Sequence, residues 1–180
     1  MMSKQSAEEN GDLFSSFWMQ KTHLGYFALL RLFIGYSFFI AGWGKYSQHG
    51  YLNPSPASPP LANVLNHWLT GTPSMPAGWY RQFIEIVVLP NAHLFGILVC
   101  AGELVVGAML LLGLGTRLAG LLGAFMAANF FLASGHMGPS NALVNQAFVL
   151  TSLLLMLAAA GRAWGVDWFL RRARPAALLW

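Results

Sequence analysis

Long apolar segments alternate with short polar ones along the chain. Four segments hold about 20 mainly apolar residues each, the length that an α-helix needs to cross the hydrocarbon core of a bilayer. The predicted spans are Leu24 to Gly44, Ala92 to Leu114, Thr116 to Ser134 and Ala142 to Gly161. The pattern therefore predicts an all-α protein built as a four-helix transmembrane bundle, with the lipid bilayer as its surroundings.

The segment between the first two spans, about 46–91, is the longest connection. Its prolines at the start oppose a helix, but an apolar stripe at i, i+3, i+4, i+7 and i+8 follows, which is typical of one helix face. The stripe consists of Leu61, Val64, Leu65, Trp68 and Leu69. WYRQFIEIVV then predicts a second short helix, with Pro90 in the first turn of the next span. We expect an extracytoplasmic loop whose short interfacial helices cover the bundle.

Composition agrees with a membrane protein. Of the 180 residues, 56% are hydrophobic and 9% are charged, whereas about 25% charged residues are usual in soluble domains. The single cysteine, Cys100, excludes a disulfide within the chain and a cysteine-based metal site. No histidine pair has i, i+4 spacing with an acid nearby. The sequence therefore predicts no metal.

Basic residues predict the orientation. Four spans place both termini and the turn between the second and third spans on one side of the membrane. That side holds Lys4, Lys21, Arg117, Arg162, Arg171, Arg172 and Arg174, and the other holds Lys45 and Arg81. Because short cytoplasmic loops are enriched in Lys and Arg, we expect a multi-pass protein of the cytoplasmic (inner) membrane with both termini inside. The same bias explains the net charge of +4 without a nucleic acid partner.

Three regions follow from this topology. A cytoplasmic tail is expected over 1–23, a membrane domain over 24–161 and a basic cytoplasmic tail over 162–180.

Three charged residues lie within the predicted spans, and two of them, Arg31 and Glu103, lie well inside the span ends. A charge at the bilayer centre costs about 2.5–3.5 kcal/mol on insertion scales, so Arg31 and Glu103 should face the bundle interior and find partners. Counted from the cytoplasmic helix ends, Arg31 lies roughly 10 Å deep and Glu103 roughly 16 Å deep, and an arginine side chain can close much of that gap. We predict an Arg31–Glu103 pair. It either only fixes helix register or acts catalytically beside a quinone pocket, by handling protons or anchoring a ligand.

Polar residues also gather near the outer ends of the spans. Lysine with histidine can attract a small anion or bind a quinone carbonyl, and the alternative is that these groups satisfy loop backbone and face water. Arg117 begins the third span, where it either anchors to lipid phosphate or is a second partner of Glu103. The candidate substrate- or quinone-binding residues are Lys45, His49, Asn129, His136 and Arg117.

Three motifs carry a family resemblance. They are LRLFIGYSFFIAGWGK in the first span, GELVVGAMLLLGLGTRLAGLLGA across the second and third, and AAAGRAWGVDWFL after the fourth. Over roughly residues 24 to 170 the chain resembles the DoxX/DoxD family of small four-helix membrane proteins.

The resemblance implies a small-subunit-like membrane protein of the thiosulfate:quinone oxidoreductase type. Such a subunit would help to transfer electrons from thiosulfate or a related sulfur compound to membrane quinone, its implied cofactor, together with partner subunits. Two alternatives stay open at this point. One is a non-catalytic accessory subunit packed in a larger respiratory or photosynthetic membrane complex, and the other, less favoured, is a small-solute transporter.

Overall fold

The chain is described by a computed structural model over residues 24–53, 59–70 and 78–174, and these ranges contain helices and no strands. Four helices are long and apolar enough to cross a membrane. They are α2 (Leu24–Ser47), α5 (Ala92–Leu112), α6 (Thr116–Ser134) and α7 (Pro139–Ala158). The prediction of an all-α, four-span bundle is confirmed. The expected tail over 1–23 lies outside the described residues.

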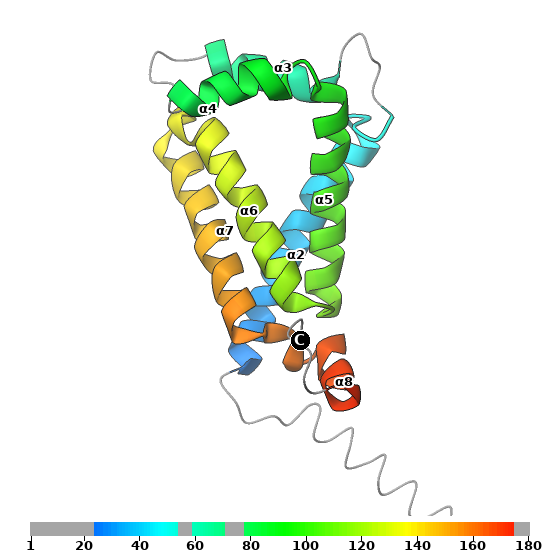
Figure 1. Ribbon diagram of the computed structural model, residues 1–180. Helices are drawn as coiled ribbons and strands as arrows, with labels where there is room; N and C mark the ends of the chain where they lie inside the picture. Colours follow the sequence, from blue (N-terminus) through cyan, green and yellow to red (C-terminus); the bar gives the residue numbers. More distant parts are fainter. Residues whose placement is uncertain (1–23, 54–58, 71–77, 175–180) are drawn as a thin grey trace, which may run out of the picture.

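The four spans form two antiparallel pairs. Helix α2 packs along α5, and α6 packs along α7. The pairs meet at the turn that joins α5 to α6 and separate toward the opposite end, where α3 (Pro60–Thr70) and α4 (Gly78–Phe83) lie across the bundle (Figure 1). We call the end with the α5–α6 turn the latch end and the end covered by α3 and α4 the cap end.

Glycines let the backbones within each pair approach closely. A Cβ atom on Gly107 would lie 2.5 Å from the backbone nitrogen of Phe39, and one on Gly42 would lie 2.8 Å from that of Leu104. In the second pair, a Cβ on Gly120 would lie 2.7 Å from a carbonyl oxygen of α7. Small residues at such contacts are typical of helix packing in lipid. The contacts also fix the register, with position 42 beside 103–104 and position 39 beside 107.

The cap agrees with the predicted amphipathic helix. Helix α3 buries Leu61, Leu65 and Leu69, three of the five residues of the predicted stripe. Helix α4 continues into a π-helical turn, η1 (Ile84–Val88), which precedes α5. Pro90 lies in the turn before α5 and not in its first helical turn as predicted, because the helix begins at Ala92.

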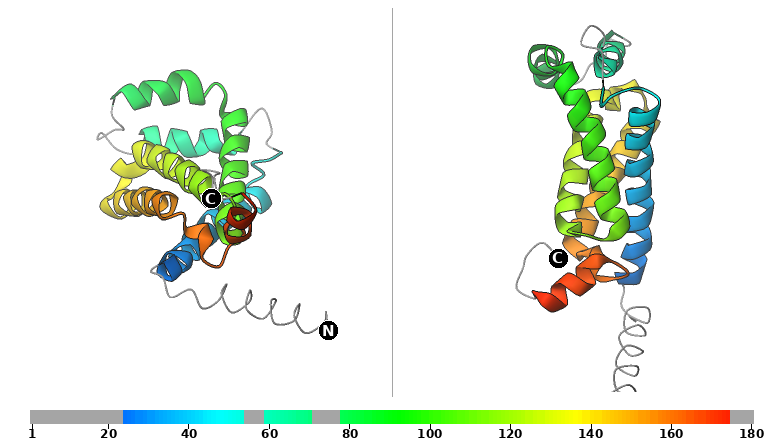
Figure 2. Two further views of the ribbon diagram at one scale, coloured as in Figure 1. Left: turned by 60° about the horizontal axis from the view of Figure 1, so that its bottom comes forward. Right: turned by 90° about the vertical axis from the view of Figure 1, so that its right-hand side faces the viewer.

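The latch end is more ordered than a tail. After α7, the chain forms a 3₁₀ turn, η3 (Ala160–Arg162), and a short helix, α8 (Val166–Ala173), which lies across the end of the bundle (Figure 2). Asp167 and Trp168 are buried there. The described part of the predicted C-terminal tail is therefore folded against the spans.

Candidate functional site

The predicted Arg31–Glu103 pair is wrong. Glu103 instead binds Lys45, whose Nζ lies 2.8 Å from Oε1 and 2.7 Å from Oε2. The depth count assumed that the first two spans end at the same level, but α2 is displaced along α5. Position 42 lies beside Glu103, so Arg31 is eleven residues, or about 16 Å at helical rise, closer to the latch end.

Arg31 is fully buried at the latch end, at 0% exposure. Its Nη1 donates to the carbonyl of Leu110 at 3.0 Å and its Nη2 to the carbonyl of Trp164 at 2.9 Å. The last carbonyls of a helix have no partner within the helix, and a cation is favourable beside them. Arg31 therefore caps the C-terminal end of α5 and connects the segment before α8 to that end.

Asp167 caps the N-terminal end of α6, as Arg31 caps the C-terminal end of α5. Its carboxylate accepts hydrogen bonds from the backbone N–H of Gly115 at 2.7 Å, from the N–H of Thr116 at 2.9 Å and from the Thr116 hydroxyl. Unpaired amides at a helix start favour an anion. Gly113 and Gly115 supply the left-handed backbone of the turn, with φ of 65° and 56°. We call Arg31, Thr116 and Asp167, with this turn, the latch.

A cavity of about 740 Å³ lies between the helix pairs toward the cap end. Helices α2, α5, α6 and α7 supply its walls, and α3, α4 and η1 cover it. Most of its lining is apolar, including Leu61, Leu65, Trp68, Ile84, Phe95, Leu98, Phe125 and Phe130. Binding sites for small molecules and cofactors are commonly built in this way, with a few polar groups on an apolar surface.

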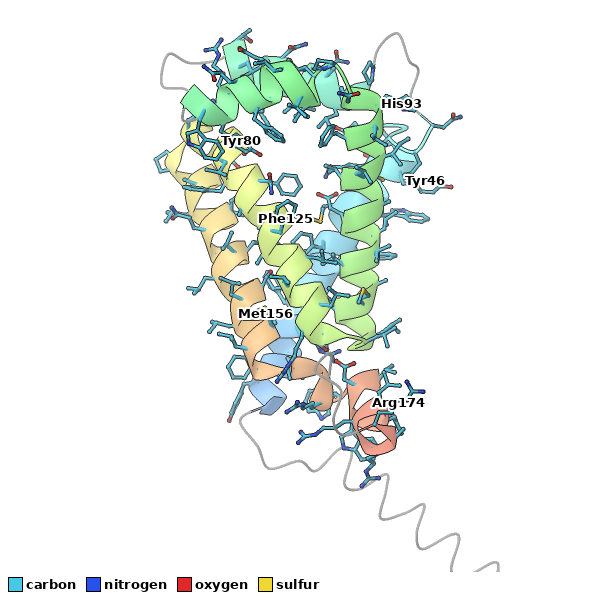
Figure 3. The ribbon with its side chains drawn as sticks, viewed as in Figure 1. Tyr46, Tyr80, His93, Phe125, Met156 and Arg174 are labelled. Carbon is cyan, nitrogen blue, oxygen red and sulfur yellow. The ribbon has the colours of Figure 1, made fainter. Side chains whose placement is uncertain are left out.

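The cavity opens sideways. Ile40 on α2, Leu98 on α5 and Phe125 on α6 line it, yet all three are exposed, Phe125 by 66%. Phe125 lies in the space between α6 and α5 (Figure 3). These residues belong to membrane spans, so the rim of the cavity faces the lipid.

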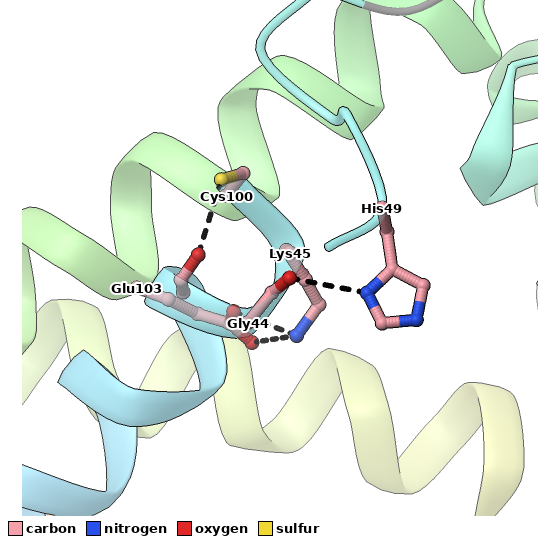
Figure 4. Close-up of polar contacts among 6 residues, drawn as sticks. Gly44, Lys45, His49, Cys100 and Glu103 are labelled. Carbon is pink, nitrogen blue, oxygen red and sulfur yellow. Dashed lines mark hydrogen bonds and ion pairs between the residues drawn. The ribbon is translucent and has the colours of Figure 1, made fainter. Parts of the chain in front are cut away.

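Lys45 lines this cavity, and its ammonium group is paired with Glu103 (Figure 4). Lys45 comes from the last turn of α2, where a cation is favoured, and its side chain is 27% exposed, against 3% for Glu103. Each charge offsets the other, which a buried charge requires. His49 follows α2, and its Nδ1 lies 3.1 Å from the Gly44 carbonyl. The pair thus presents an ammonium group to the cavity.

A second polar group faces the cavity from α6 and α4. The Tyr80 hydroxyl donates to Asn129 Oδ1 at 2.9 Å, and Asn129 Nδ2 donates to the Phe125 carbonyl at 2.7 Å. Burial raises the pKa of Tyr80, so that it keeps its proton at neutral pH. Burial, followed by the charge of Glu103, likewise raises the pKa of Tyr51, which also lines the cavity.

The structure brings together three of the five candidate binding residues. Lys45, His49 and Asn129 line the cavity. His136 instead lies in η2 (Gly135–Met137), the 3₁₀ turn after α6, and its Nε2 lies 3.0 Å from the Trp68 carbonyl, so it connects this turn to the cap. Arg117 lies in the first turn of α6 at the latch end, more than one helical turn beyond the level of Glu103, which leaves Glu103 to Lys45.

Sequence analysis assigned no role to Tyr80 or to Asp167, although Asp167 lies in the third motif of the family resemblance. A signal for Tyr80 existed, because Tyr80, Ile84 and Val88 recur every four residues and are all buried. Asp167 was the one acid in an arginine-rich stretch. Among the residues that the structure describes, no group of three or more His, Cys, Asp or Glu could hold a metal ion.

These features define a multi-pass membrane protein whose two helix pairs are joined at one end and enclose a lipid-facing cavity with a buried ion pair. The chain belongs to the DoxD family: the family model described as TQO small subunit DoxD matches residues 26–177, where TQO denotes thiosulfate:quinone oxidoreductase. The match includes the ion pair, the cavity and the latch. No curated protein and no solved structure matches the chain.

Proposed function

We propose that this chain is the quinone-binding membrane subunit of an oxidoreductase that passes electrons from thiosulfate, or a related sulfur compound, to membrane quinone. One observation carries the proposal. An apolar cavity opens toward the lipid, and Lys45, the partner of Glu103, lines it. The family description supports a link to quinone.

The polar groups of the cavity suit a quinone head. Its carbonyl oxygens need hydrogen-bond donors, and Lys45 has three N–H groups, so it can serve Glu103 and a ligand together. Asn129 and Tyr80 supply polar groups from another wall. The apolar lining and the rim at Leu98 and Phe125 suit an isoprenoid tail.

Quinone supplies the chemistry of accepting two electrons and two protons. In the proposed site, Lys45 binds the head and holds a proton at Nζ. Glu103 keeps that ammonium charged and in place, because its two oxygens accept from Nζ at 2.8 and 2.7 Å. The apolar lining around the pair excludes water.

The sulfur compound is less suited to the cavity. Thiosulfate is a dianion, and burying a charge without a partner is costly. Lys45 is already neutralised by Glu103, and the surrounding lining is mainly apolar. We therefore assign oxidation of the sulfur compound to a partner subunit, and quinone binding to this chain.

The proposed orientation places the latch end in the cytoplasm and the protein in the inner membrane. Arg117, Arg162, Arg171, Arg172 and Arg174 belong to the latch end, in agreement with the rule for basic residues. A cysteine introduced at Arg174 should resist a membrane-impermeant thiol reagent in spheroplasts, and one at His67 should react. The native Cys100 is buried and should give little background.

The test begins with purification in a mild detergent. Co-eluting chains are identified by mass spectrometry, bound quinone is extracted, and thiosulfate-dependent quinone reduction is measured. Glu103→Gln and Lys45→Ala should each lower turnover at least about tenfold. The matched control is Arg81→Gln, which breaks the exposed Arg81–Glu85 pair and should leave turnover unchanged. Equal turnover in all variants would refute a role for the cavity pair.

A second candidate is a non-catalytic subunit of a larger membrane complex. Helix α7 favours it, because only 11% of its span is buried, against 33–39% for the other spans. Its exposed residues include Leu143, Leu150 and Leu157, which would suit a partner helix. Recovery in a large complex with no bound quinone and no effect of Lys45→Ala would support this candidate.

A further inference from the structure

The latch end concentrates positive charge from three elements. Arg117 lies on α6, Arg162 on η3, Arg171 and Arg172 on α8, and Arg174 directly after α8. Within the described part of this end, Asp167 is the only acid, and its carboxylate is occupied by the start of α6.

Arg162 lies near enough to Arg171 and Arg117 to be affected by the positive charges of both. The pKa of Arg162 is lowered by burial and then by the positive charges of Arg171 and Arg117, against the opposing charge of Asp167. Arginine stays charged in spite of such shifts. Like charges held together by the fold repel, and an anion among them would offset that repulsion. Arginine is also well suited to bind phosphate, because its donors match two oxygens at once.

The arginines lie at the level where the spans end. Helix α5 ends at Leu112 and α6 begins at Thr116. Close by, α8 exposes both apolar and basic side chains, namely Val166, Phe169, Arg171 and Arg172. A helix of this kind is typical of the headgroup region of a bilayer. Within α8, the Arg172 guanidinium stacks on Trp168 one turn earlier, 4.1 Å from the centre of its ring.

We propose that Arg117, Arg162 and Arg171 bind the phosphate of an anionic phospholipid headgroup at the latch end. The latch builds this site, because Asp167 holds the start of α8 against the first turn of α6, which carries Arg117. The apolar residues of α8 would contact the acyl chains of the same lipid leaflet. This site is separate from the cavity and does not depend on quinone binding.

The experiment compares lipids on the purified full chain in a neutral detergent. Thermal unfolding is followed with phosphatidylglycerol, phosphatidylcholine or inorganic phosphate at equal concentration, and bound lipids are counted by native mass spectrometry. Phosphatidylglycerol should raise Tm and stay bound, and the other two should not. Arg162→Gln with Arg171→Gln should weaken phosphatidylglycerol binding about thirtyfold, given roughly 1 kcal/mol for each basic residue near anionic lipid. Arg81→Gln should bind as the unchanged protein does.

Three results would overturn the proposal. An equal response to phosphatidylcholine would show general solvation by lipid. A Tm rise with inorganic phosphate alone would identify a site for a soluble anion. Full binding by the double variant would exclude these arginines. If the double variant does not fold, Arg117→Gln is tested in its place. In addition, the unchanged protein must lose bound phosphatidylglycerol as the salt concentration rises, because salt screens exposed charges.

Discussion

At the residue scale, Glu103 depends on Lys45. Lys45→Met would leave the buried carboxylate without its cation, and we expect the free energy of unfolding to fall by about 3 kcal/mol. Glu103→Gln should cost less, because the amide oxygen still accepts a hydrogen bond and Lys45 is partly exposed. The double variant Lys45→Met with Glu103→Met should recover much of the loss. Unfolding in detergent, followed by circular dichroism, measures all three.

The matched control for this cycle is the Arg81–Glu85 pair. It has the same 2.7 Å separation, but its side chains are 40% and 42% exposed. Exposed pairs contribute about 0–1 kcal/mol, so Arg81→Gln and Glu85→Gln should add independently. If the cavity pair shows no larger coupling than this control, the two cavity charges are solvated and do not depend on each other.

The latch gives a second prediction at this scale. Asp167→Asn replaces one carboxylate oxygen by an amide nitrogen, which cannot accept from the donor that it faces, Gly115 or Thr116, and it removes the charge at the start of α6. Hydrogen bonds to charged groups contribute about 1.5–3 kcal/mol each, so we expect a loss of roughly 3 kcal/mol in unfolding free energy. Thr116→Val removes only the hydroxyl donor and should cost about 1 kcal/mol. An equal effect of the two variants would contradict the part assigned to the carboxylate.

At the element scale, the glycines of α2 and α5 set how closely the two helices pack. Gly107→Ala would place a methyl group 2.5 Å from the backbone of Phe39. The helices must then separate, and we expect a loss of about 1–3 kcal/mol, as for other overpacked sites. Gly25→Ala on the same pair has nothing within 4 Å and should be neutral or slightly stabilising. Thermal unfolding of both variants is the measurement. A lower Tm in Gly107→Ala alone would show that crowding between the helices outweighs the gain in helix propensity.

The four spans could be predicted from the sequence, but the partner of Glu103 could not, because it depends on the contacts of these glycines. Apolar length identified all four spans, and the third was placed with its observed bounds, because composition alone determines which segments lie in lipid. Partner choice depends on how far α2 slides along α5, and that is set by backbone contacts at Gly42 and Gly107. The hydrophobic periodicity of each helix shows which face is buried, but not how far one helix is displaced along the other. Charged residues were therefore correctly expected to face inward, and Glu103 was given the wrong partner.

At the scale of the whole molecule, the latch and the cap have different effects on the helix pairs. The latch joins the end of α5, the start of α6 and the segment before α8 through Arg31 and Asp167. The cap spans the pairs at the other end, where His136 contacts the Trp68 carbonyl. The pairs are thus held together at one end and apart at the other. The cavity between them is a consequence of this arrangement.

The cavity can be blocked without disturbing the helix contacts. Gly44 lines it, and a Cβ there meets nothing within 4 Å, so Gly44→Phe should place its ring in the open space beside Lys45. We expect quinone affinity, measured by titration of the purified protein, to fall at least about tenfold while Tm changes little. Gly25→Phe, at the other end of α2, should leave affinity unchanged. Unchanged affinity in Gly44→Phe would place quinone outside the cavity, whereas loss in both variants would indicate a general effect of the added ring on α2.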